Sequence, residues 1–159
     1  MTVLLRQRES GYNMIFDLER FIKAQDTDYE TALNEIKAGR KKSHWIWYIF
    51  PQLQELGRSY NAKYYGIENL DEAKNYLAHS VLGRRLIEIS GALLNLSENN
   101  PNVVMNGEID AMKLQSCMTL FAYACGEKDS IFREVLEKFF NGKTDVNTIK
   151  IIDKRIPKP

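Results

Sequence analysis

Apolar residues recur every three or four positions along most of the chain, a spacing that predicts amphipathic helices. The clearest case is Val81 to Leu96. A longer pattern, Glu108 to Cys125, is apolar around much of its circumference and ends at Gly126. We therefore expect this longer segment to be the central helix. No stretch shows the alternation of a strand or a hairpin, so the pattern predicts an all-α fold.

Shorter helices are predicted on both sides of these two. Thr27 and Glu30 fit a capping box, which separates a helix at 15–24 from one that ends at Gly39. Asp129 is the expected cap of a late helix, and a loop is expected from Asn99 to Gly107. The other predicted helices lie between Gly57 and Gly66, after Asn69 or Asp71, and at 145–152. Together they indicate a single compact domain over 14–153, an orthogonal array of about seven or eight short helices, between a flexible arm (1–13) and a basic tail (154–159).

Composition narrows the function classes. Among 159 residues, 44% are hydrophobic and the net charge is +1, so the chain lacks the basic excess of a protein that wraps nucleic acid. Cys117 and Cys125 are too far apart along a helix for a disulfide. We find no secretory signal, no membrane-length apolar run, no metal-type cluster and no sign of a cofactor. A cytoplasmic protein is expected, and its oligomeric state has no signal in the sequence.

The densest stretch is Ser-His-Trp-Ile-Trp-Tyr-Ile-Phe-Pro-Gln at 43–52, which holds both tryptophans and one of the two histidines. Its apolar run is nearly continuous, so periodicity does not distinguish a buried strand from a buried helix. We favour a short buried helix that ends before Pro51, because the neighbouring segments are all helical.

Four segments carry a resemblance to a known family: GRKKSHWIWYIFPQ (39–52), LGRS (56–59), YLAHSVLGRRL (76–86) and DAMKLQSCMTLF (110–121). They resemble the signature of a bacterial family called domain of unknown function 1810, often labelled calpastatin-like, over about residues 16–152. That resemblance implies a single all-α domain and no established activity. Ser80 stands where the family usually has Pro, and Cys117 where it usually has Ser. A fainter likeness to the YbiA-like family of N-glycosidases links the chain to ADP-ribose-type compounds.

Several side chains of the first segment are candidates for a site, each with a structural alternative. His44 is a candidate acid/base or phosphate ligand, or it holds the segment in place. Trp45 and Trp47 cannot share a helical face, so one is expected in the core and the other in a groove, where it would stack on a ring. Gln52 presents an amide to a ligand or caps the next helix. The basic run, Arg40, Lys41 and Lys42, favours an anion site or is a solvated surface.

The second candidate element is a polar stripe on the central helix: Asp110, Lys113, Ser116 and Thr119, spaced three apart. The stripe is expected to face the His44 segment across a pocket, although Asp110 and Lys113 also fit a simple surface pair. Ser116 has no elbow motif to make it a nucleophile. His79 is expected as a helix cap, with Arg84 and Arg85 available for an anion.

These elements lead to two hypotheses of different class. In the first, the protein binds a small anionic ligand, a nucleotide or ADP-ribose-like compound, as a hydrolase or transferase. His44, Asp110 and Lys113 would then be catalytic, and the ligand would be bound by Arg40, Lys42, Trp45, Trp47, Gln52, Ser116 and Thr119. In the second, the protein is a non-enzymatic interaction domain whose signature residues are structural. Single-stranded nucleic-acid binding would need a continuous basic groove lined by aromatic side chains.

Overall fold

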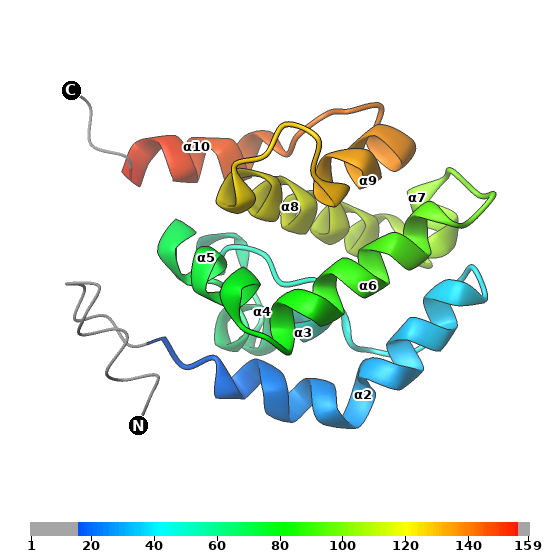
Figure 1. The fold of residues 1–159 in the computed structure, drawn as a ribbon, viewed down its shortest axis with the longest axis horizontal. Coiled ribbons are helices and arrows are strands. Elements are labelled where there is room, and N and C mark those ends of the chain that lie inside the picture. Colours follow the sequence, from blue (N-terminus) through cyan, green and yellow to red (C-terminus); the bar gives the residue numbers. More distant parts are fainter. Residues whose placement is uncertain (1–15, 156–159) are drawn as a thin grey trace.

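The computed structural model describes residues 16–155, so the arm predicted at 1–13 and the end of the basic tail lie outside it. The described part is all-α, as predicted, with nine α-helices and one 3-10 turn (Figure 1). The elements in chain order are α2 (Glu19–Lys37), α3 (Ile46–Ile49), η1 (Gln54–Leu56), α4 (Tyr60–Tyr64), α5 (Leu70–Ala78), α6 (Leu82–Leu94), α7 (Pro101–Val104), α8 (Glu108–Cys125), α9 (Ile131–Phe140) and α10 (Val146–Arg155). Within this range, no helix has the length and apolar character needed to cross a membrane.

Helix α8 is central, as its pattern predicted. It packs against α5, α7, α9 and α10, and Figure 1 shows it running through the middle of the fold. Its bounds match the prediction, because Gly107 precedes it at φ 136° and Gly126 ends it in the left-handed region at φ 72°. Cys117, on the same helix, is fully buried. Burial raises the pKa of its thiol well above the usual value, so it behaves as a small apolar group.

The predicted break at Thr27 was wrong, because α2 is one continuous helix from Glu19 to Lys37. Thr27 and Glu30 are simply exposed positions within it. Gln25 is buried just before the predicted break and donates hydrogen bonds to the carbonyl of Tyr48 (2.7 Å) and the hydroxyl of Tyr76 (2.9 Å). These tertiary contacts favour an unbroken helix over the local capping signal.

Two other local predictions need correction. Ser130, not Asp129, caps α9, since its hydroxyl accepts from the backbone N–H of Arg133. The loop predicted from Asn99 to Gly107 contains α7, which Asn100 caps through Asn102 N–H with Pro101 in the first turn. An Asn-Pro pair is typical of a turn and also of a helix start, so the sequence pattern alone allows both. Asn69 caps α5, as expected.

The segment between α3 and α5 is held by close backbone contacts. Leu53 and Ile67 form an isolated parallel bridge, and a Cβ atom on Gly57 would lie 2.8 Å from the Ala62 backbone. Arg20, on α2, closes the far end of the segment by pairing with Glu72 at 2.9 Å. These contacts fix η1 and α4 against the rest of the fold.

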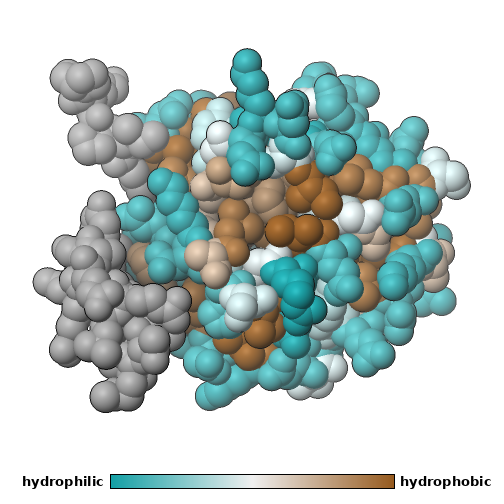
Figure 2. Space-filling model, viewed as in Figure 1, coloured by the Kyte–Doolittle hydropathy of each residue, from teal (hydrophilic) through white to brown (hydrophobic). Residues whose placement is uncertain are grey.

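The face in view in Figure 2 has hydrophobic side chains gathered in its middle, with hydrophilic ones around them. Helix α6 crosses the middle of this face in Figure 1. Its large apolar residue Ile87 is 49% exposed. Single exposed apolar side chains are common on folded proteins and carry no functional meaning alone.

Candidate functional site

Glu35, near the end of α2, binds the loop that leads into the Trp-rich segment. Its carboxylate accepts four hydrogen bonds: from the backbone N–H groups of Lys42 (2.7 Å) and Ser43 (2.9 Å), from the Ser43 hydroxyl (2.5 Å) and from the Trp45 indole (2.9 Å). Burial alone would raise the pKa of Glu35, but these four donors outweigh it and lower the pKa to about 2. We call Glu35, Ser43 and Trp45 the Glu35 cluster.

Lys41 connects this cluster to the central helix. Its side chain is buried (5% exposed), with the ammonium 3.0 Å from Asp110 of α8, 2.5 Å from the Ser43 carbonyl and 4.9 Å from the centroid of the Trp45 ring. The second lysine near Asp110 is Lys113, at 3.8 Å. Asp110 is therefore held between two ammonium groups, one inside the fold and one beside solvent.

The rest of the segment divides between core and surface. Trp45 is 1% exposed and therefore packs in the core. Trp47 is half-buried, and the ammonium of Lys113 lies 5.6 Å from its ring centroid. His44 and Lys42 are exposed, and Arg40, also exposed, donates to Asn106 at 2.9 Å. We expected the segment and the polar stripe of α8 to face each other across a pocket. Instead they are in direct contact, through Lys41–Asp110 and Lys113–Trp47.

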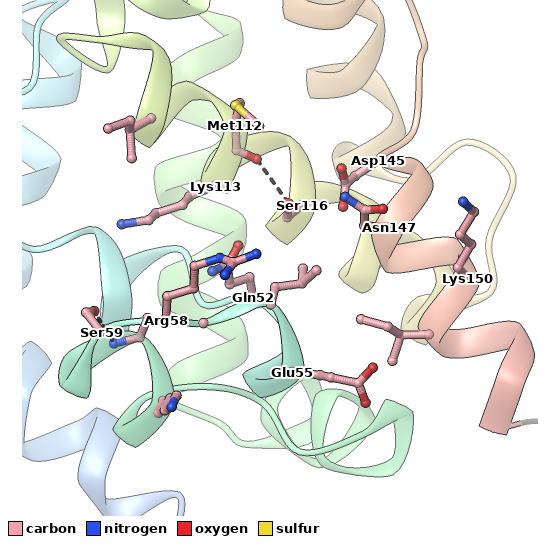
Figure 3. A pocket seen from close by; sticks show the side chains of 16 residues that line it. Gln52, Glu55, Arg58, Ser59, Met112, Lys113, Ser116, Asp145, Asn147 and Lys150 are labelled. Carbon is pink, nitrogen blue, oxygen red and sulfur yellow. Dashed lines mark hydrogen bonds between the residues drawn. The ribbon is translucent and has the colours of Figure 1, made fainter.

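A cavity of about 1100 Å³ opens beside these contacts, between the segment from Gln52 to Lys63, the first half of α8 and the start of α10 (Figure 3). Four of its lining residues are cationic: Arg58 and Lys63 from the α4 region, Lys113 from α8 and Lys150 from α10. They face two carboxylates, Glu55 and Asp145. The wall is therefore cationic on balance, and its cations come from three separate elements.

The two carboxylates already have partners. Asp145 caps α10, where one oxygen accepts from the backbone N–H (2.9 Å) and the hydroxyl (2.6 Å) of Thr148. Glu55 lies 3.9 Å from Lys154. Within residues 16–155, by contrast, the charged groups of Arg58, Lys63 and Lys150 have no ion pair or hydrogen bond. In Figure 3, Arg58 and Gln52 extend toward the middle of the cavity.

The uncharged part of the cavity lining contains both apolar side chains and polar ones. Ile109 and Met112 present exposed apolar side chains from α8, and Leu56 and Ile151 add to this apolar wall. Ser116 is buried, and its hydroxyl donates to the Met112 carbonyl at 3.1 Å. Within the described range, the side-chain amides of Gln52 and Asn147 have no hydrogen-bond partner in the protein.

The cavity brings together only some of the residues predicted for a site. Gln52, Lys113 and Ser116 line it. Thr119 is fully buried, where its hydroxyl donates to the Gln115 carbonyl and accepts from the Asp145 N–H at 2.9 Å, and so it fixes the start of α10. The predicted residues that do not line the cavity are Arg40, Lys42, His44, Trp45, Trp47, Asp110 and Thr119. The acid/base role of His44 stays a prediction.

Sequence reasoning missed Arg58, Lys63 and Lys150, the cations without partners. A signal for Arg58 existed, because Gly57-Arg58-Ser59 is a short polar segment between two helices, where glycine permits the close contact with Ala62. Lys150 had no such signal, since nothing in its spacing shows that α10 lies against α8. No group of three or more metal-type ligands occurs among residues 16–155.

With this geometry in view, the chain is a small helical protein with a mixed cationic and apolar cavity. A family model described as "Protein of unknown function (DUF1810)" matches residues 15–152, so the chain belongs to that family, as the sequence motifs implied. The crystal structure of the conserved hypothetical protein Rv1873 from Mycobacterium tuberculosis is similar to it. The two are 40% identical with a TM-score of 0.83, over 87% of this chain and 97% of that one. No match is found among curated proteins.

Proposed function

We propose that the protein binds a small anionic ligand, with phosphate or carboxylate groups, in the cavity between η1, α4, α8 and α10. One observation carries the proposal: Arg58, Lys63, Lys113 and Lys150 line a single cavity, and three of the four charges have no partner in the described range. These four cations outnumber the two carboxylates of the lining, Glu55 and Asp145. A concave surface with an excess of one charge sign attracts the opposite ion.

Each cation has a distinct part in this proposal. Arg58 offers a planar guanidinium, which binds phosphate or carboxylate through two parallel hydrogen bonds. Lys113 acts as a point charge whose other neighbours are Asp110 (3.8 Å) and the Trp47 ring. Lys63 of α4 and Lys150 of α10 add two further ammonium groups to the lining. We assign Lys113 to charge neutralisation, because Asp110 already holds its ammonium at the cavity edge.

A nucleotide or ADP-ribose-like compound is the finer form of the proposal, and hydrolysis or group transfer would be a further step. His44 and Asp110, the acid/base candidates, do not line the cavity. We therefore propose that the cavity binds an anionic ligand, and we assign no catalytic step to it. The alternative is an interaction domain in which the same residues only stabilise the fold.

Isothermal titration calorimetry with inorganic pyrophosphate and ADP tests this directly. We expect Arg58→Met and Lys113→Met to weaken binding at least about 10-fold each, the loss of a charge-assisted hydrogen bond. The matched controls are Arg84→Met on α6 and Lys74→Met on α5, which remove the same charges from exposed positions outside the cavity lining. These controls should stay within about twofold of wild type, since exposed charges at a distance are screened by salt.

Two results would overturn the proposal. The first is absence of binding to either anion at low ionic strength, with all variants folded by circular dichroism. The second is equal loss of affinity in the Arg58 and Arg84 variants, which would show that net charge and not this cavity controls the interaction. Either result favours the interaction-domain alternative.

A further inference from the structure

Ile109 and Met112 are apolar side chains left open to solvent along one wall of a charged cavity. They are 72% and 58% exposed, and both line the cavity from the same face of α8. Residues three apart on a helix are neighbours, so the two form one apolar surface. Lys113 and Ser116 continue the same face into the cavity.

From this arrangement we infer that Ile109 and Met112 form the seat of a nucleobase, and that the ligand is a nucleotide whose phosphate lies on Arg58 and Lys113. This inference rests on the proposed anion site and names the class of its ligand. The apolar pair and the ammonium of Lys113 belong to adjacent positions of one helix. The ligand must therefore join an apolar surface to an anionic group over a short span.

The uncharged polar groups of the lining distinguish a base from a plain hydrocarbon. Gln52 and Asn147 line the same cavity, and their side-chain amides are free of protein partners in the described range. An amide donates and accepts at once, which suits the edge of a heterocyclic ring. An acyl chain would cover these amides without replacing their hydrogen bonds to water, and that costs free energy.

The size of the cavity points the same way. Its volume of about 1100 Å³ is slightly above the range of small-molecule sites, which is roughly 300–1000 Å³. A lone phosphate would leave most of this space to water. One of the two tryptophans was expected to stack on a ring, but neither Trp45 nor Trp47 lines the cavity. We therefore assign the apolar contact with a base to Ile109 and Met112 of α8.

The experiment compares nucleotides with the same phosphate lacking a base. Dissociation constants are measured by calorimetry for AMP, GMP, CMP, UMP and ribose 5-phosphate. We expect at least one nucleotide to bind about 10-fold or more tightly than ribose 5-phosphate. The double variant Ile109→Ser/Met112→Ser should lose that advantage and bind ribose 5-phosphate as wild type does.

The matched control is Ile87→Ser, because Ile87 is also an exposed isoleucine, at 49%, but lies on α6 outside the lining. It should change no dissociation constant. The inference is overturned if ribose 5-phosphate binds as tightly as every nucleotide, or if the double variant keeps the advantage of the base. In both cases the anion site survives, provided that Arg58→Met still weakens ribose 5-phosphate binding by about 10-fold or more. If none of the five compounds binds, the anion site falls as well.

A second copy of this chain is the other occupant that an exposed apolar pair invites. Sedimentation velocity over a range of concentrations tests it with the same variants. Wild type should keep one sedimentation coefficient. A dimer that Ile109→Ser/Met112→Ser dissociates and Ile87→Ser leaves intact would overturn the inference.

Discussion

The Glu35 cluster and the cavity lie side by side, but the polar groups of the cluster have protein partners and several of those in the cavity have none within residues 16–155. In the cluster, the Glu35 carboxylate accepts four hydrogen bonds, and beside the cluster Lys41 is buried against Asp110. In the cavity, Arg58 and Lys150 face solvent without protein partners in the described range. The first arrangement is complete without a ligand, and the second gains from an anion. A high density of aromatic and titratable residues in a sequence therefore does not tell which region leaves charged groups without partners.

Asp110 marks the boundary between the two regions. It pairs with Lys41 on the buried side and with Lys113 on the cavity side. Substitutions on the two sides should consequently separate stability from binding. Those in the Glu35 cluster should lower the stability of the fold, and those in the cavity should leave stability intact but weaken anion binding.

The largest effect is expected from Trp45→Ala. It removes a buried ring and a hydrogen-bond donor to Glu35, which should lower the free energy of unfolding by about 3–5 kcal/mol. Urea denaturation followed by far-ultraviolet circular dichroism measures this. Trp47→Ala is the matched control and should cost about 1 kcal/mol, since a half-buried side chain forfeits less transfer free energy. Equal costs for the two tryptophans would contradict the division between core and surface.

Lys41→Met should have the second largest effect on the free energy of unfolding. The substitution leaves Asp110 with Lys113 alone and removes the ammonium from the Ser43 carbonyl, at a cost of about 2–3 kcal/mol. We take a value below that of a fully buried pair because Asp110 is partly exposed. Lys42→Met, next in the chain and exposed, should stay within about 0.5 kcal/mol of wild type. If Lys42→Met destabilises as much, the basic run acts as a whole and not through Lys41.

A pH dependence follows from Glu35. Its pKa is about 2 in the folded protein against an ordinary value of 4.5, so the stabilisation is fully present above pH 4.5. It is lost as the pH falls from about 4.5 toward 2, because the unfolded state then binds the proton more readily. The expected loss is on the order of 2 kcal/mol.

Urea midpoints between pH 2 and pH 6 measure this dependence. Glu35→Gln should flatten the curve over that window, and Glu30→Gln, at an exposed position of the same helix, should leave its shape intact. A Glu35→Gln curve as steep as that of wild type would mean that other carboxylates govern the acid response.

The smallest effect is expected from His44→Ala. His44 is exposed and outside the cavity lining, so stability should change by less than about 0.5 kcal/mol and pyrophosphate affinity by less than about twofold. Denaturation and calorimetry on one preparation give both numbers. Loss of anion binding in a folded His44→Ala protein would restore the histidine to the site.

How far the sequence predicts the fold depends on whether the signal is local. The limits of α8 were predictable because a glycine stands at each end and its apolar residues cover most of the circumference. The predicted break at Thr27 was wrong because a capping box is a pattern of only four residues. The contacts of Gln25 with Tyr48 and Tyr76, which are distant in sequence, favour a continuous α2.

The candidate site shows the same limit. Gln52, Lys113 and Ser116 were predicted from a rigid turn and a polar stripe, which are local patterns. Lys150 joins the cavity only because α10 packs on α8, and that packing leaves no trace in spacing. Lys41 was predicted only as part of a basic run, an anion site or a solvated surface. Its buried pairing was missed because its partner Asp110 lies on a distant helix.

The two tryptophans stand two residues apart but report on different parts of the molecule. Trp45 is sealed from water, with its indole N–H on Glu35, so its fluorescence should be blue-shifted and resistant to soluble quenchers. Trp47 is half-buried, with the ammonium of Lys113 5.6 Å from its ring centroid. An anion that draws Lys113 toward the cavity would change the emission of Trp47 and leave that of Trp45 constant. If the proposed anion binds, Trp47 would be an intrinsic optical indicator of occupancy and Trp45 its internal reference.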